Sequence, residues 1–199
     1  MLTMQKEEIA AAAARMIAEE GLDYGTAKRK AFALITGGRD SRAHRQALPS
    51  NDDLEEALRD YQQLYQSDSQ PARLRALREK ALALMVLLQD FSPTVTGAIA
   101  NGTANEFSDI HLHCFADNAK ELGIFLLNLG ISADADTLPH ARSGREQVEA
   151  LAIDWQGELA VIAVYPHTDM RGAMKPNAQG RLQRLDIKSL QNLLTNEPL

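Results

Sequence analysis

The residues with the clearest potential for chemistry lie in the stretch SDIHLHCF, residues 108–115. Asp109, His111 and His113 occupy every second position, and apolar residues fill the positions between them. Because side chains at i and i+2 of a β-strand point to the same face, this spacing predicts a strand with one polar and one apolar face. We expect the apolar face to pack on a helix and the polar face to line a cleft.

Asp109 and His111 could bind a ligand or a metal ion together, since same-face neighbours in a strand lie roughly 6 to 7 Å apart. An aspartate with a neutral imidazole is a poor Mg²⁺ site, because Mg²⁺ prefers oxygen ligands, whereas Zn²⁺ or Mn²⁺ is possible. His113 lies about 13 Å of strand from Asp109, so all three donors are not expected to converge on one ion. The alternative is that Asp109 joins a hydrogen-bond network and that both histidines are ordinary polar cleft residues.

The stretch before this strand, GAIANGTANEFS at 97–108, has the composition of a ligand-binding turn. Gly97 and Gly102 have no Cβ, which lets the backbone approach a ligand closely. Free amide groups in such a turn can donate hydrogen bonds to phosphate oxygens. We therefore expect this turn to face a cleft whose far wall is the hairpin at 151–165.

The combined stretch GAIANGTANEFSDIHL resembles the signature of the DNA polymerase beta-type nucleotidyltransferase superfamily, especially its minimal bacterial members. The positions that match without a gap are Gly97, Ala100, Gly102, Ser108, Asp109, Ile110 and Leu112. Over residues 94–165 the resemblance implies a small mixed sheet with packed helices. It also implies phosphate or nucleotide contacts at Gly97, Ala98, Gly102, Thr103 and Ser108. In that superfamily, two aspartates and a third carboxylate from a later strand hold two Mg²⁺ ions around a nucleoside triphosphate.

Several positions depart from this pattern. Ala98 stands where the superfamily has a phosphate-contacting serine, and His111 replaces the second aspartate. The third carboxylate is expected within GELAVIAVYP, where an ungapped alignment places Val161. Asp154 and Glu158 flank that hairpin and could substitute only in a different register. Asp109 and His111 remain as the candidate catalytic and metal-binding residues, with Mg²⁺ or Mn²⁺ expected if the protein is active.

Three functions follow from these residues. The first is a divergent nucleotidyltransferase-like protein that lacks ordinary two-metal catalysis and acts as a nucleotide- or phosphate-binding or regulatory module. The second is an active enzyme that moves a nucleotide from a nucleoside triphosphate to a small molecule, a protein or RNA. The third is a scaffold without a nucleotide ligand, which binds a protein partner through its N-terminal helices.

The elements that position this stretch fall into two regions, and the predicted fold class is α+β. Residues 1–91 have a helical pattern, with Asp23 as the N-cap of a second helix and Pro71 in the first turn of a fourth. Residues 92–199 alternate strands and helices, with a helix capped by Asp117, a loop at 133–144 and a hairpin that turns at 156–157. A last helix is expected to be capped by Asp186.

The composition of the chain limits the kinds of partner that it is expected to bind. The net charge is −6 and the pI about 5.4, which argues against a surface that is basic throughout, as many duplex-DNA binders have. Cys114 is the sole cysteine, so a disulfide framework or a cysteine-based zinc cluster within one chain is excluded. The sequence has no uninterrupted apolar segment of about 18 residues, and we predict a cytoplasmic protein with no membrane partner.

Positive charge is concentrated between Lys28 and Arg45, on Lys28, Arg29, Lys30, Arg39, Arg42 and Arg45. This patch could bind RNA weakly and in a salt-sensitive manner, or it could simply be a solvated helix face followed by a loop. Arg171 and Lys175 lie in the predicted loop at 167–180, Arg181 directly follows it, and all three could likewise contact phosphates.

Overall fold

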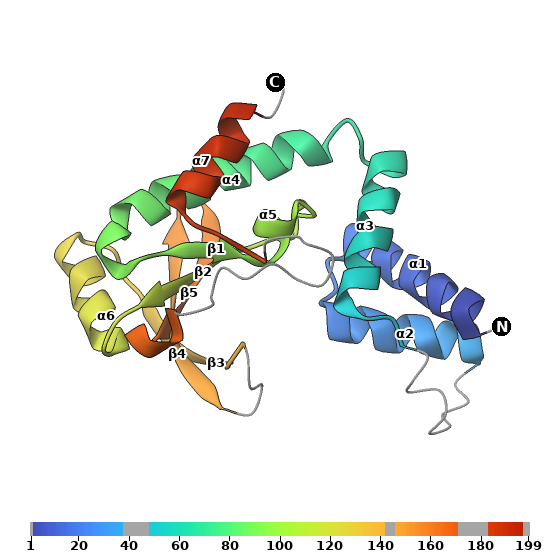
Figure 1. Ribbon diagram of the computed structural model, residues 1–199, viewed down its shortest axis with the longest axis horizontal. Helices are drawn as coiled ribbons and strands as arrows, with labels where there is room; N and C mark the ends of the chain where they lie inside the picture. The colour runs from blue at the N-terminus through green and yellow to red at the C-terminus, as the bar shows by residue number, and fades with distance from the viewer. Residues whose placement is uncertain (1, 38–47, 142–145, 171–182, 197–199) are drawn as a thin grey trace. The chain divides into compact units, whose positions relative to one another are not determined.

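The computed structural model describes residues 2–37, 48–141, 146–170 and 183–196, and it has the predicted α+β class (Figure 1). The chain forms two compact units. The helical unit comprises Met1–Arg73 and Gly102–Phe107, and the sheet unit comprises Leu74–Asn101 and Ser108–Leu199. A short piece of the predicted turn therefore packs with the helices, while both of its flanks belong to the sheet unit.

The helical unit is built on α1 (Leu2–Glu20), α2 (Tyr24–Thr36) and α3 (Asn51–Tyr65). Asp23 caps α2 as predicted, because its carboxylate accepts a hydrogen bond from Thr26 N at 2.9 Å. Small alanines of α1 and α2 let the helices approach closely around a core of fully buried side chains. This core includes Ile9, Ala13, Ala27, Leu54 and Leu58.

The sheet unit contains a six-stranded mixed sheet in the order β3-β4-β5-β2-β1-β6. Its strands are β1 (Thr94–Thr96), β2 (Ile110–Phe115), β3 (Asp134–Pro139), β4 (Gln147–Trp155), β5 (Glu158–Tyr165) and β6 (Arg184–Leu185). The central strand β2 pairs antiparallel with β1 and parallel with β5. β5 pairs with β2 along its whole length and β1 pairs with His111, Leu112 and His113, so side chains of the three strands form continuous rows at these positions.

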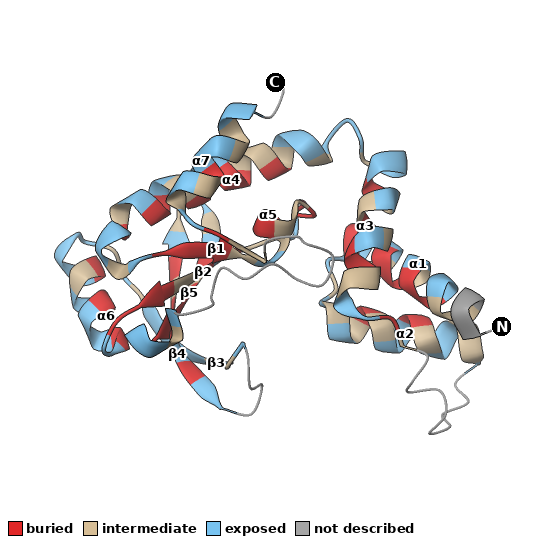
Figure 2. Cartoon of the chain, in the orientation of Figure 1, coloured by how far each residue is buried: buried red, intermediate tan, exposed pale blue. Residues whose placement is uncertain are grey.

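The helices of this unit are α4 (Gln70–Leu87), α5 (Gly97–Asn101), α6 (Ala119–Asn128) and α7 (Ile187–Asn196), with short 3₁₀ turns η2 (Gln89–Phe91) and η3 (His167–Met170). One face of the sheet packs on α4 and α6. Lys80 of α4 pairs with Glu158 at 2.7 Å, and Leu151 lies against Gly123 of α6. Figure 2 shows buried residues along the strands and on the inner sides of these helices.

The change of sequence pattern at residue 92 and the division into units do not coincide. The division falls within α4, between Arg73 and Leu74. Most of α4 belongs with the sheet because Leu77, Leu84 and Met85 are fully buried there. Its apolar stripe is needed to cover strands that follow later in the chain.

Three local predictions can be compared with the structure. The hairpin is confirmed: β4 and β5 pair antiparallel, and Gln156 and Gly157 adopt the positive φ angles of 54° and 79° that a tight two-residue turn requires. The loop predicted at 133–144 is wrong, since β3 occupies part of it as an exposed edge strand. The cap of α6 is Asn118 rather than Asp117, with Asn118 Oδ1 accepting from Glu121 N. Among the described residues, no helix is long and apolar enough to cross a bilayer.

Candidate functional site

The two faces of β2 are sorted as the sequence predicts. Ile110, Leu112 and Cys114 are fully buried, and they form what we call the core face. His111 is exposed and His113 is half-buried on the opposite side, which we call the histidine face. Asp109 lies immediately before the strand and is half-buried. The predicted alternation is therefore confirmed, and His111 does not pack into the core.

A row of side chains crosses the histidine face at the level of His111. His111 is paired with Thr96 of β1 on one side and with Val161 of β5 on the other. Arg184 of β6 is in turn the partner of Thr96, so its guanidinium belongs to the same face. Because β5 is the immediate neighbour of β2, the hairpin extends this face and is not the far wall of a cleft, contrary to the expectation from the sequence.

The protonation of His111 depends on the burial of its ring and on the nearby carboxylate of Asp109. Desolvation by nearby protein atoms lowers the pKa of His111, and the negative charge of Asp109 opposes that shift. Desolvation has the larger effect, so the ring is neutral at physiological pH and offers one nitrogen as a donor and the other as an acceptor. A neutral imidazole can bind a phosphate oxygen or a ribose hydroxyl through a hydrogen bond.

His113 and Thr94 are cross-strand partners on the same face, one pair further along. Burial lowers the pKa of His113 to about 3, and the positive charge of Arg184 adds to this effect. His113 Nδ1 and Thr94 Oγ1 are both buried and make no hydrogen bond within the described residues. A buried polar atom left without a partner costs about 1–3 kcal/mol, so packing among the described residues does not account for these two polar atoms.

Beside this pair, a pocket of about 300 Å³ is lined in part by Thr94, Phe115, Met170 and Lys188. Phe115 follows His113 by two positions in β2 and so lies on the histidine face, as does its ladder partner Tyr165. A volume near 300 Å³ is at the lower end for small-molecule sites. The pocket lies at the end of the histidine face next to Thr94, and His113 is not among the residues that line it.

The sequence did not reveal several polar residues of this region. His140 Nε2 lies 2.9 Å from Asp169 Oδ2, and the His140 ring stacks edge-on against Tyr165 with centroids 5.2 Å apart. Tyr165 also contacts the ring of His113, at 4.7 Å. The sequence does not indicate His140, because 133–144 has the composition of a loop, and it does not indicate Arg184, because a two-residue strand has no detectable period.

The donor set does not fit a pair of Mg²⁺ ions. The carboxylates expected from the superfamily would stand at Asp109, at 111 and at 161, but the last two are His111 and its ladder partner Val161. Within the described residues, no group of at least three histidine, cysteine or acidic side chains could hold a metal ion. Asp109 and His111 alone also fall short of the four donors usual for Zn²⁺.

The two carboxylates considered as substitutes serve other roles. Glu158 lies on the core side of β5, where Lys80 Nζ donates to its carboxylate at 2.7 Å. Asp154 closes the hairpin turn by accepting a hydrogen bond from Gly157 N at 3.1 Å. Asp154 is on a strand two positions from β2, a separation of roughly 10 Å by ordinary strand spacing, so it cannot share one ion with Asp109.

The predicted phosphate-contact residues are divided between the two units. Gly97 and Ala98 begin α5, where Gly97 has a φ of 66° that favours glycine. Gly102 and Thr103 pack with the helical unit, and Thr103 is only 1% exposed. Ser108 is half-buried and precedes Asp109 in the sheet unit. The described structure thus places these residues without showing a shared binding site for them.

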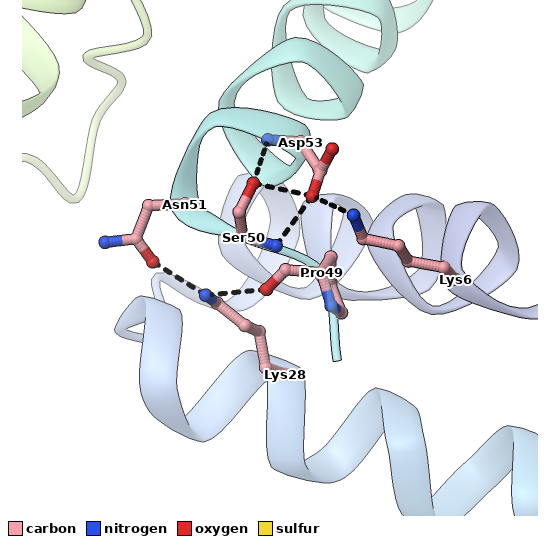
Figure 3. Close-up of polar contacts among 6 residues, drawn as sticks. All are labelled: Lys6, Lys28, Pro49, Ser50, Asn51 and Asp53. Carbon is pink, nitrogen blue, oxygen red and sulfur yellow. Dashed lines mark hydrogen bonds and ion pairs between the residues drawn. The ribbon is translucent and has the colours of Figure 1, made fainter. Parts of the chain in front are cut away.

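The predicted basic patch is largely engaged in holding the helical unit together, in so far as it lies within the described residues. Lys28 Nζ donates to Pro49 O at 3.0 Å and to Asn51 Oδ1 at 2.6 Å (Figure 3). Lys30 lies 3.7 Å from Glu20, and Arg29 donates to Thr26 Oγ1. The remaining cations predicted to contact phosphates, Arg39, Arg42, Arg45, Arg171, Lys175 and Arg181, lie outside the described residues.

The same region of the helical unit explains how α3 begins. Ser50 and Asp53 form a capping box, in which Ser50 Oγ accepts from Asp53 N and Asp53 accepts from Ser50 N (Figure 3). Lys6 of α1 lies 2.7 Å from the same carboxylate, and these hydrogen bonds lower the pKa of Asp53 to about 2. These contacts are structural, because each polar group is paired within the unit.

No protein-family model, no curated protein and no solved structure matches this chain. The resemblance to nucleotidyltransferases therefore remains a proposal that rests on the residues of the chain and on the pairing of its strands.

Proposed function

We propose that the chain is a divergent nucleotidyltransferase-like protein whose histidine face binds a nucleotide or another phosphate compound as a binding or regulatory module. It does so without ordinary two-metal catalysis. The observation that carries the proposal is the parallel pairing of His111 with Val161. These are the positions at which the resemblance expects the second and third carboxylates, and they are neighbours on one face of the sheet.

The charges of the histidine face support a ligand that is bound without metal ions. Arg184 brings a permanent positive charge to this face, near enough to influence the pKa of His113. A guanidinium binds phosphate oxygens through planar, charge-assisted hydrogen bonds. His111 adds a neutral donor in the same row, whereas the Thr96 hydroxyl donates to Gln183 O at 3.1 Å and retains only its acceptor capacity. Asp109 is the one carboxylate expected to orient a hydroxyl of the ligand.

The alternative of an active transferase has weaker support. Two-metal catalysis supplies several kcal/mol of charge stabilisation in the transition state, and it requires carboxylates that bridge and position both ions. Asp109 cannot do this with His111 and Val161 as its neighbours. Activity would require another arrangement of donors.

The scaffold alternative is favoured by a different observation. Leu64 and Tyr65, at the end of α3 in the helical unit, are 73% and 72% exposed. Exposed apolar side chains of this size can mark a protein contact. A protein partner at this position is compatible with a regulatory role for the histidine face.

The test of binding is a thermal-shift series with ATP, CTP, GTP and UTP, each with and without Mg²⁺. A ligand present at a hundred times its Kd stabilises the native state by about 2.7 kcal/mol and so raises Tm. We expect such a rise without Mg²⁺, its loss in Arg184→Met, and its retention in the control Lys120→Met, which alters an exposed residue of α6. If none of the nucleotides raises Tm, nucleotide binding by the histidine face is refuted.

The test of catalysis is incubation with radiolabelled nucleoside triphosphates and cell extract. We expect no appreciable Mg²⁺-dependent labelling by the wild-type protein. Strong labelling that disappears in Asp109→Ala would show that His111 works as an unusual ligand in an active enzyme, and the alternative function would replace the one proposed.

A further inference from the structure

The helical unit encloses the segment Gly102–Phe107, which lies in the chain between α5 and Asp109. Thr103, Ala104 and Asn105 are each buried to more than nine-tenths. This degree of burial is unusual for a polar connection that carries no helix or strand, since loops ordinarily run over the surface. Its backbone polar groups must therefore find partners within the unit.

Two glutamine side chains provide these partners. Gln62 of α3 is only 4% exposed, and its Nε2 donates to Thr103 O at 2.8 Å. Gln70 Nε2 donates to Gly102 O at 3.1 Å and to Ala104 O at 2.9 Å. Three successive carbonyl groups of the segment thus accept hydrogen bonds from amide side chains of the helical unit.

A close apolar contact holds the end of the segment. A Cβ at Gly21 would lie 2.6 Å from Phe107 Cγ, so glycine is required for the ring to rest against the chain at the end of α1. Asn105 Oδ1 accepts from Phe107 N at 3.0 Å, which fixes the local turn. Hydrogen bonds and an apolar contact therefore hold the segment against the helical unit at several points.

We propose that Gln62 and Gln70 are positioning residues for ligand binding at the histidine face. By holding Gly102–Phe107, the helical unit restricts the connection that continues through Ser108 into Asp109. This inference rests on the proposed function, because it assigns the helical unit a regulatory role over that same ligand. Loosening the segment is expected to weaken nucleotide binding, and ligand binding is expected to increase protection of the segment, since such coupling is reciprocal.

The experiment compares Gln62→Met and Gln70→Met with the matched control Gln66→Met. Gln66 Nε2 donates to Ala18 O at 3.2 Å, so the control removes the same kind of bond in the same unit without touching the segment. Hydrogen exchange of residues 102–107 is measured first, without ligand. The Kd values for ATP, CTP, GTP and UTP are then measured by calorimetry at a temperature well below Tm.

We expect faster exchange in Gln62→Met and Gln70→Met and, for Gln70→Met, a Kd about fivefold to tenfold higher, the effect of losing roughly one net hydrogen bond. Gln66→Met is expected to leave both quantities unchanged. Gln70→Asn keeps the amide on a shorter stem and provides a milder variant if Gln70→Met does not fold; partial recovery of Kd is expected there.

Each outcome has a distinct meaning. Unchanged hydrogen exchange in both test variants would overturn the holding role of the glutamines. If Gln66→Met accelerated exchange equally, the effect would be general destabilisation of the helical unit, and the specific holding role would again be overturned. Faster exchange with an unchanged Kd would overturn the coupling but not the proposed function. Failure of the wild-type protein to bind any of the nucleotides would overturn the nucleotide-binding part of the proposed function and the coupling together.

Discussion

The two faces of β2 belong to one strand, yet their side chains are determined by different forces. On the core face, Ile110, Leu112 and Cys114 are completely buried and packed between the sheet and its helices. On the histidine face, His111 is exposed, and His113 retains a buried nitrogen without a hydrogen bond among the described residues. Packing alone accounts for the first face, whereas the second has polar atoms that packing does not explain.

This difference teaches where to look for function in a fold without matching relatives. A close-packed face is costly to alter and carries information about stability. A face that retains unpaired polar atoms lowers the stability of the fold, so its residue types require another explanation, such as a ligand. The predictions below test this distinction between the two faces.

The largest effect is expected from Leu112→Ala on the core face. Removing a fully buried leucine side chain leaves a cavity and typically lowers the free energy of unfolding by about 2–5 kcal/mol. His111→Ala changes an exposed residue on the opposite face and is expected to change it by no more than about 0.5 kcal/mol. Both values are measured by guanidinium chloride unfolding at neutral pH, followed by circular dichroism.

Similar losses in the two variants would contradict the comparison, because His111 would then be packed as firmly as Leu112. Ile110→Val is a useful intermediate control, since it removes one methylene from the same core face and is expected to cost about 0.5–1.5 kcal/mol.

The next effect is the dependence of stability on pH, to which His113 is expected to contribute most, with the lowered pKa of His111 acting in the same direction. The pKa of His113 is about 3 in the folded protein, against 6.5 for an ordinary histidine, because burial disfavours the charged ring. Between these values the unfolded state binds a proton that the folded state excludes. This contribution therefore lowers the free energy of unfolding as pH falls below about 6.5, by at most about 1.4 kcal/mol per pH unit.

The measurement is denaturant unfolding at pH 7 and at pH 5 for the wild-type protein, His113→Phe and the control His167→Phe. His113→Phe replaces the imidazole by an apolar ring beside Tyr165 and is expected to reduce the loss of stability at pH 5. His167 is exposed, so its replacement is expected to leave the pH dependence intact. An unchanged pH dependence in His113→Phe would show that His113 is not the group responsible.

The sequence alone predicts the core face well, because burial imposes a period of two that can be recognised without a structure. Ile110, Leu112 and Cys114 were placed correctly for this reason. The hairpin turn at Gln156 and Gly157 was also predictable, since few residues tolerate its backbone angles. By contrast, β3 was missed because most of its residues are exposed and therefore show no burial period.

The histidine face could be predicted only in part. His111 and His113 share a strand, so their common orientation follows from local geometry. The neighbours Val161 and Arg184 come from distant parts of the chain, and only strand order and register bring them to His111 and Thr96. Likewise, no local pattern indicates that Gln62 and Gln70 hold the segment that follows α5.

The smallest effect is expected from restoring carboxylates to the histidine face. His111→Asp adds an oxygen donor close to Asp109, and Val161→Asp adds another at the paired position of β5. Mg²⁺ prefers such ligands, so the double variant is expected to be stabilised by Mg²⁺ at ten times its Kd by about 1.4 kcal/mol. The wild-type protein is expected to show no comparable gain, and the measurement is Tm against Mg²⁺ concentration.

The matched control for this prediction is the double variant His111→Asn with Val161→Asn, which has nearly the same shape without the added negative charges. A Mg²⁺ response in the aspartate pair alone would show that this row has the geometry of a metal site and that its residue types, not its backbone, exclude the ion. Equal responses in both pairs would attribute the effect to ionic strength. No response in either would mean that the strand row cannot gather its side chains around one ion, and the resemblance to nucleotidyltransferases would lose its main geometric support. Nucleotide transfer is a separate requirement even in the aspartate pair, since Ala98 stands in place of the serine that the resemblance expects to contact phosphate.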